Sequence, residues 1–223
     1  MGLFRFGGIN LHPSALPVYR GCTPVNAAIL NGDKETAFTI QKVSAKMDEG
    51  NILAQQKVVL NGTETAGSLL NDAAVQGAEL IAGLLAEISA NNDIADGTPQ
   101  RGEASYTGII SKQDAKINWS DSAEKIDRTV RGYFPEPNAW TLENDLPLKI
   151  MSGLPVSDDE GAALGGNVDA VPGTVCAFSK EKGILVRCGS GFYAVTKLQR
   201  QGKNAMDYKS CMNGAKNFIG TVL

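Results

Sequence analysis

Residues 65–89 constrain the fold of this chain more than any other segment. Within them Leu69, Ala73, Leu80 and Leu84 recur at intervals that place apolar side chains on one side of an α-helix. Three glycines in the same stretch lower its helix propensity but allow close packing. A helix of this length with one apolar side needs a surface to cover. The sequence therefore predicts an amphipathic helix lying on a β-sheet.

The residues before this helix alternate between strand and helix patterns. Residues 38–43 and 52–60 have the composition of strands, and an apolar entry ending at residues 9–12 indicates another. Residues 25–31 predict a short helix, with Thr23 at its N-cap position.

His12 is the single histidine of the chain, and Asn10 precedes it by two positions. Residues two apart on a strand project to the same side, so an amide and an imidazole are expected to point together beyond the strand end. Asp48, on a polar turn between two predicted strands, can lie beside the imidazole. An amide that holds an oxyanion and an imidazole that moves a proton suit acyl-group chemistry. A lone histidine is more often a surface or hydrogen-bonded core residue, so the surrounding sequence must distinguish a structural from a catalytic role.

An ordered series of motifs supplies that context. Asn-x-His-Pro-Ser-x-x-Pro occupies residues 10–17, Tyr-Arg-Gly residues 19–21, Asn-Gly-Asp residues 31–33 and Met-Asp-x-Gly residues 47–50. In this order the motifs resemble the formyltransferase family that uses 10-formyltetrahydrofolate.

Later segments resemble one branch of that family. Residues 106–119 and 131–140 are similar to the segment that follows the catalytic domain in methionyl-tRNA formyltransferases, and residues 198–214 to the end of their C-terminal domain. The resemblance implies formyl transfer from 10-formyltetrahydrofolate to the amino group of methionyl initiator tRNA, a step of translation initiation. The alternatives are a formyl domain of the 10-formyltetrahydrofolate hydrolase and dehydrogenase type, a sugar-nucleotide formyltransferase, or an RNA-binding remnant without catalysis.

The resemblance also implies residue roles. Asn10 would donate to the tetrahedral oxyanion, His12 would stabilise it and relay a proton, and Asp48 would orient His12 and help to deprotonate the amine. The loop implied to contact the folate comprises Ser14, Ala15, Leu16 and Pro17. No metal is implied. Three motifs depart from the family pattern: Ala15 replaces a leucine, residues 21–24 read Gly-Cys-Thr-Pro in place of Gly-Ala-Ala-Pro, and Asn51 replaces the second acid of the turn.

The implied architecture is α/β: the C-terminal part of a doubly wound, Rossmann-like formyltransferase domain, followed by a small OB-like β-barrel. We expect a partial catalytic domain at residues 1–110, a post-catalytic segment and linker at 111–170, and a tRNA-binding barrel at 171–223. By comparison with the family pattern, we expect about half of the doubly wound sheet to be missing upstream. A chain without it is expected to be aggregation-prone or inactive, because an opened sheet exposes an edge strand and an apolar face. A complete protein is expected to be a monomer.

The last part of the chain is basic. Residues 171–223 carry eight Lys and Arg against two acidic residues, whereas residues 1–170 carry 13 against 22. Strand patterns in the same tail predict a small barrel, on which such charge is typical of a nucleic-acid surface. A solvated charged surface is the alternative. Lys197, Arg200 and Lys203 are the candidate phosphate contacts for tRNA.

The cysteines indicate a reduced, metal-free protein. Cys22, Cys176, Cys188 and Cys211 lack the paired spacing of zinc ligands and have one histidine for company. Residues 1–8 are too short to be expected to act as a signal peptide, and we expect no apolar run of membrane-spanning length. The sequence therefore predicts a cytoplasmic protein without a membrane partner.

Overall fold

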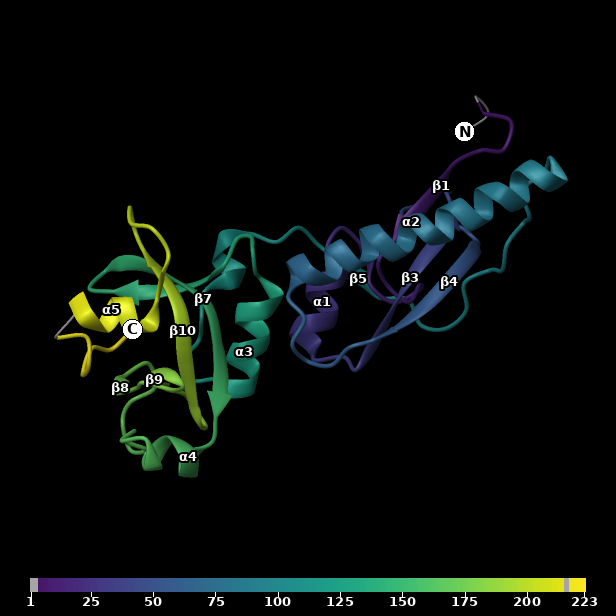
Figure 1. Ribbon diagram of the computed structural model, residues 1–223. Helices are drawn as coiled ribbons and strands as arrows, with labels where there is room; N and C mark the ends of the chain where they lie inside the picture. The colour runs from purple at the N-terminus through teal and green to yellow at the C-terminus, as the bar shows by residue number, and fades with distance from the viewer. Residues whose placement is uncertain (1–3, 215–216) are drawn as a thin grey trace. The chain divides into compact units, whose positions relative to one another are not determined.

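The computed structural model describes residues 4–214 and 217–223, and the chain divides into two compact units, residues 1–110 and 111–223 (Figure 1). The elements of the first unit are β1 (Ile9–His12), β2 (Arg20–Gly21), α1 (Pro24–Asn31), β3 (Glu35–Lys42), β4 (Ile52–Val59), α2 (Ala66–Asn91) and β5 (Tyr106–Thr107). The elements of the second unit are η1 (Lys112–Ala115), α3 (Ala123–Gly132), β6 (Ala139–Glu143), β7 (Leu146–Val156), α4 (Asp158–Ala163), β8 (Val175–Ser179), β9 (Gly183–Arg187), β10 (Phe192–Arg200), β11 (Met206–Asp207) and α5 (Tyr208–Gly214).

The first unit is built on a three-stranded sheet in the order β1-β3-β4. Both pairings are antiparallel, and the register sets Asn10 opposite Gln41 and His12 opposite Thr39. The central strand β3 is buried from Thr36 to Gln41. Within the described residues of this unit, the one parallel strand pairing joins β2 to β5, whereas a doubly wound sheet is mainly parallel. The unit is α/β as expected, but these three strands are antiparallel.

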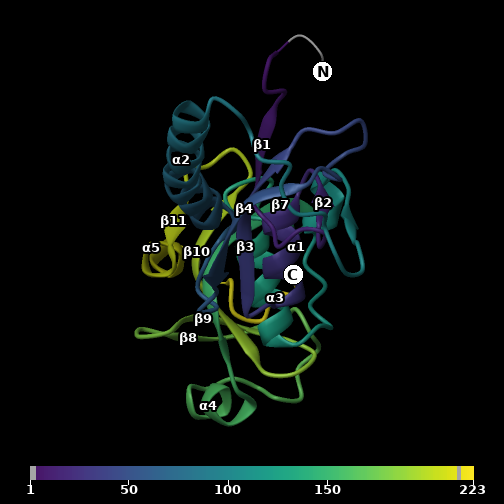
Figure 2. The same ribbon diagram turned by 90° about the vertical axis from the view of Figure 1, so that its right-hand side faces the viewer.

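Helix α2 covers the sheet as the apolar periodicity predicted, and Figures 1 and 2 show it lying along the strands. Thr65 caps the helix by accepting from the Ser68 amide, while the Ser68 hydroxyl accepts from the Thr65 amide. Leu69 packs with Phe38 in the core of this unit. Gly77 lies directly against Leu11 of β1, so a side chain at this position would clash.

The expectation about membrane-spanning length needs a correction. By length and composition alone α2 could cross a membrane, since an 18-residue window has a mean hydropathy of 1.3 and only 17% of that window is buried. The apolar residues are not confined to the side that packs on the sheet: Leu70, Val75 and Leu85 are exposed. Core helices of water-soluble proteins have similar composition, so this property alone does not establish a membrane segment.

The second unit contains a six-stranded antiparallel sheet in the order β6-β7-β10-β9-β8, with β11 paired to β10. The strand patterns of the tail are confirmed, since β8, β9 and β10 lie in it. Helix α3 packs on β7 and β10, and its Ile126 and Val130 join Ile150, Ile184 and Leu198 in the main core.

The expected boundary at residue 170 is not seen in the structure. Strand β7 pairs with β10 along most of its length, so residues on both sides of position 170 share one sheet. The segment expected to be a linker contains α4, whose N-cap Ser157 accepts from the Glu160 amide. Residues 111–170 therefore belong to the same unit as the tail, because the hydrogen bonds of β7 are made with it.

Candidate active site

Asn10 and His12 of strand β1 line one cavity. The cavity has a volume of about 340 Å³ and is also lined by Asp48, Cys22, Pro24 and Leu70. Positions 10 and 12 share a side of the strand, while Leu11 between them packs against Gly77 of α2. The sequence prediction that these two side chains would point together with Asp48 nearby agrees with this geometry.

His12 is held at both ring nitrogens. Its Nε2 lies 2.8 Å from the Tyr19 carbonyl oxygen and therefore carries the hydrogen that it donates. Its Nδ1 faces Oδ1 of Asp48 at 3.7 Å, and the side chain is 4% exposed. This arrangement gives the protonated ring two acceptors and leaves the Nδ1 lone pair of the neutral ring toward Asp48. His12 can take up a proton without moving.

Asp48 is fixed by three contacts on its carboxylate. Oδ2 accepts from the Gly21 amide at 2.8 Å, and Oδ1 accepts from Nε2 of Gln41 at 2.9 Å while it faces His12. The backbone of Asp48 is left-handed, with φ 53°. Gly50 completes the turn, because any side chain there would strike the Lys42 carbonyl. The Asp-x-Gly pattern thus has a steric reason.

The carboxamide of Asn10 is free. It has no hydrogen-bond partner among the residues that the structure describes, and the residue is exposed to solvent. An amide N–H in this state can donate to a ligand oxygen without breaking an existing bond.

A second cavity adjoins the first and shares Asn10 and Asp48 with it. Its volume is about 410 Å³, and its apolar lining includes Ile9, Val43 and Met47. Asn10 and Asp48 therefore lie where two ligands, one in each cavity, could meet.

The loop expected to contact a folate is largely internal. Ser14 is fully buried and its hydroxyl donates to the Val18 carbonyl at 2.6 Å. Leu16 and Pro17 are also buried, and Ala15 lines a different cavity, of about 350 Å³. Three of these four side chains therefore support the loop and do not face either cavity beside Asn10.

Tyr19 links this loop to α1. Its phenol donates to Asp33 at 2.8 Å and accepts from Asn31 at 2.8 Å. Burial raises the pKa of Tyr19, and Asp33 raises it further, while the bond from Asn31 opposes the shift. The phenol therefore stays neutral and holds the backbone whose carbonyl receives the hydrogen of His12.

Sequence reasoning missed the amides around Asp48. Gln41 and Gln100 both contact the turn, and Gln100 donates to the Asp48 and Gly50 carbonyls at 2.8 Å each. Gln41 could have been found from its place on a buried strand opposite Asn10. Gln100 lies in a stretch without periodicity, where nothing in the sequence marks it.

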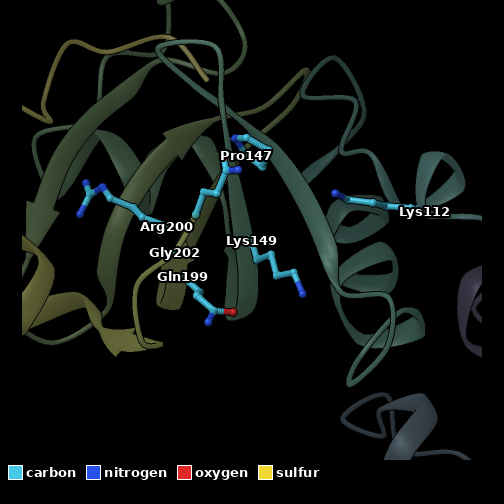
Figure 3. Close-up of a pocket in the computed structure, with 7 residues that line it drawn as sticks. Lys112, Pro147, Lys149, Gln199, Arg200 and Gly202 are labelled. Carbon is cyan, nitrogen blue, oxygen red and sulfur yellow. The ribbon is translucent and has the colours of Figure 1, made fainter.

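The basic residues expected to contact tRNA are placed differently from one another. Lys197 and Lys203 are exposed. A pocket of about 280 Å³ nearby is lined by Lys112, Lys149, Gln199 and Arg200 (Figure 3). Lys112 and Lys149 lie outside the basic tail, so a charge count by segment concealed them.

The guanidinium of Arg200 is held by contacts within the protein. Its Nε and Nη2 donate to the two oxygens of Glu143 at 2.6 and 2.8 Å, and its guanidinium lies 5.0 Å from the Phe218 ring centre. The bond to Glu143 raises the pKa of Arg200 further above its usual range. In Figure 3 its guanidinium points away from Lys149. Arg200 therefore offers a phosphate less charge than the tail sequence suggests.

Two family profiles match the chain. The profile described as formyl transferase matches residues 2–85, and that described as formyl transferase, C-terminal domain, matches residues 109–216. A solved structure, HypX from Aquifex aeolicus in complex with tetrahydrofolic acid, has a TM-score of 0.66 and 15% identity over 95% of this chain and 36% of its own. The matches define the class of protein as formyl transferases and support the formyltransferase fold.

Curated relatives narrow the class. A methionyl-tRNA formyltransferase of Treponema denticola is 38% identical over 98% of this chain and 67% of its own length. One of Thiobacillus denitrificans is 36% identical over 100% of this chain and 69% of its own length. The chain belongs to the methionyl-tRNA formyltransferase family, and it spans about two thirds of the length of these relatives.

Proposed function

We propose that this protein transfers a formyl group from 10-formyltetrahydrofolate to the α-amino group of methionyl initiator tRNA, in the cytoplasm, at the start of translation. One observation carries the proposal: Asn10, His12 and Asp48 converge on one cavity, and the Asn10 amide is free to bind a ligand oxygen. The family of the chain supports the same reaction.

The chain supplies the groups for a direct transfer. The amine nitrogen attacks the formyl carbon, and Asn10 donates to the oxyanion that forms. Asp48, which borders the cavity, helps to take the proton lost by the amine and shares it with His12 through the facing Oδ1 and Nδ1 atoms. The pair passes this proton towards N10 of the folate, which leaves, while the His12 ring stabilises the negative charge. Asp48 keeps the ring in place, since its Oδ1 faces Nδ1 of His12 at 3.7 Å. No serine or cysteine nucleophile takes part.

The two adjoining cavities fit a reaction of two substrates. We assign the folate to the cavity lined by Val43 and Met47, whose apolar rim suits a flat heterocycle, and the acceptor amine to the cavity lined by His12. Asn10 and Asp48 line both cavities. A residue that acts on the transferred carbon must lie at such a junction of the two substrates. The loop of residues 14–17 then acts on the folate indirectly, by holding the backbone beyond His12.

The second unit is proposed to bind tRNA. Its antiparallel sheet fits the OB-like barrel expected from the sequence, a fold that often carries a nucleic-acid surface. Lys149, Lys112 and the exposed Lys197 and Lys203 supply positive charge for phosphates. Such contacts position an RNA without reading its sequence.

Product analysis with a radiolabelled formyl donor tests the proposal. The protein is incubated with 10-formyltetrahydrofolate and, in separate reactions, methionyl-tRNA, an amino-sugar nucleotide, or buffer alone. We expect label on methionyl-tRNA and little release of formate without an acceptor. Rapid formate release would favour the hydrolase alternative, label on the sugar would favour a sugar formyltransferase, and binding of tRNA without turnover would leave an RNA-binding protein.

A further inference from the structure

Gln100 joins three parts of the first unit around the turn that carries Asp48. Its Nε2 donates to the carbonyls of Asp48 and Gly50, each at 2.8 Å. Its Oε1 accepts from Nε and Nη2 of Arg20 at 3.1 and 2.7 Å. The side chain thus uses its donor and its acceptor at once, between the turn and β2.

The backbone fixes Gln100 at this point. Two residues earlier, Thr98 exchanges two hydrogen bonds with Ile52, the first residue of β4, at 2.8 Å each. The segment leading to Gln100 is therefore tied to the strand that follows the turn. Gln100 reaches the turn from a rigid support.

Arg20 extends the contact to the remaining residue of the turn. It lies 3.3 Å from Glu49, and its Nη1 donates at 2.8 Å to the Tyr106 hydroxyl, which in turn donates to Glu49 at 3.2 Å. Glu49 is partly exposed to solvent, and these two neighbours hold its carboxylate on one side. Residues 48, 49 and 50 are all held through Gln100 or Arg20.

Gln100 also orients a second amide. Its Nε2 lies 3.4 Å from Oε1 of Gln41, a side chain 2% exposed whose Nε2 donates to Asp48 Oδ1. The oxygen of Gln41 lies beside the amide nitrogen of Gln100, and the nitrogen of Gln41 faces Asp48. The amide of Gln100 therefore reaches the carboxylate by two routes, through the turn backbone and through Gln41.

We propose that Gln100 is a positioning residue for the formyl-transfer reaction: it holds Asp48 in its left-handed conformation and so sets the alignment of Asp48 with His12. This inference rests on the proposed function for its catalytic consequence. The structural consequence of the inference, the position of the Asp48 carboxylate, does not depend on the proposed function. Displacement of a catalytic group by about 1 Å can cost about 100-fold in rate.

The test compares Gln100→Leu and Gln100→Glu with the native protein. The leucine removes both functions of the amide, and the glutamate keeps an acceptor for Arg20 but has no donor for the two carbonyls. Gln76→Leu is the matched control, because it removes an amide bonded to Gln56 in the same unit, away from Asp48. We expect kcat to fall by about 10- to 100-fold in both Gln100 variants, with each KM changed less than about threefold, and the pH profile of kcat to change.

Two NMR readouts do not depend on activity. The Gly21 amide donates to Asp48, so its hydrogen exchange should quicken by about tenfold or more when Asp48 is released. His12 is the single histidine, so its ring nitrogen signals need no assignment by mutation and should change in both variants. Native exchange and native His12 signals in folded Gln100→Glu would overturn the positioning role. If the native protein does not transfer a formyl group, the proposed function is wrong. The exchange of the Gly21 amide and the His12 signals still test the role of Gln100 in that case. If Gln100→Leu does not fold, the glutamate variant decides.

Discussion

Asn10 and His12 share one side of β1 but differ in freedom. His12 is bonded at Nε2 and faces a carboxylate at Nδ1, whereas the Asn10 amide has no partner among the described residues. A donor for a transient oxyanion is most useful when it is unbonded in the resting site, and a proton carrier is most useful when it is held still. The two residues therefore suit different roles.

Strand periodicity placed Asn10 and His12 on one side of a strand and a polar turn placed Asp48 within reach, and the resemblance to the formyltransferase family singled out these three residues. The sequence could not predict Gln100, which lies far along the chain in a segment without helical or strand periodicity. Its position follows from the pairing of Thr98 with Ile52, a tertiary contact. The commitment of Arg200 to Glu143 is likewise a tertiary contact, between β10 and the end of β6.

At the same scale, Arg200 and Lys149 should respond differently to substitution. Arg200→Met removes two charged hydrogen bonds to Glu143 and should lower the free energy of unfolding by about 1–2 kcal/mol, since the pair is partly exposed. Lys149→Glu should leave stability nearly unchanged and weaken tRNA binding. Its log-log salt slope should become shallower by about 1. Urea unfolding and tRNA titration at several salt concentrations measure both quantities. The opposite pattern, with Arg200→Met affecting binding alone, would return Arg200 to the RNA surface.

Among the elements, α2 and β1 depend on one close contact. Gly77 of α2 lies against Leu11, which stands between Asn10 and His12 on β1. The helix therefore presses on the back of the strand that carries the site.

Two glycines of α2 allow a matched test of this contact. Gly77→Ala should lower the free energy of unfolding by about 1 kcal/mol or more, because the new methyl group overpacks Leu11. A methyl group added at Gly83 would meet no neighbouring side chain or strand within 4 Å. Gly83→Ala should therefore raise stability by about 0.5–1 kcal/mol through helix propensity. Chemical unfolding of both variants gives the values. Equal effects of the two substitutions would show that α2 does not pack on β1 as described.

The sequence predicted elements well where an apolar pattern repeats over many residues, and poorly where pairing with a distant strand sets the bounds of the element. The helix expected at residues 65–89 is α2, from Ala66 to Asn91, because its apolar residues repeat over many turns. Strand β7 runs from Leu146 to Val156 because β10 supplies hydrogen-bonding partners along it, and such pairing between distant segments is not marked by a sequence period. The segment expected at residues 111–170 included a linker, yet Ser157 caps helix α4 within it. Composition does not report such a local cap reliably.

At the scale of the whole molecule, alkaline pH should lower the free energy of unfolding of the second unit. Burial raises the pKa of Cys188 from 9.0 to about 12. Between these values the unfolded chain loses the thiol proton and the folded chain keeps it. The unfolded state then binds fewer protons, so stability falls as pH rises, by up to about 1.4 kcal/mol per unit for this group. Burial also raises the pKa of Tyr193 and Cys211 in the same unit, with the same sign.

Substitution of Cys188 isolates this effect. Cys188→Ala should lose stability at pH 7, through a small cavity that does not depend on pH. Between pH 7 and pH 10 its stability should then fall less than that of the native protein, by about 1 kcal/mol. Urea unfolding of the two proteins at both pH values measures the difference. Parallel loss in the two proteins would mean that Cys188 titrates at its usual value when folded.

The most direct measurement is single-turnover formylation of methionyl-tRNA by the native protein and by its His12→Ala variant. With Asn10 and Asp48 intact, loss of the imidazole should lower the rate of formyl transfer by about 100-fold or more, about 3 kcal/mol of transition-state stabilisation. The variant should keep its fold, because among the described residues the His12 side chain bonds only the Tyr19 carbonyl and faces Asp48. Circular dichroism and folate binding check this. Formylation by a folded His12→Ala variant at close to the native rate would contradict the assignment of this cavity as the site of formyl transfer.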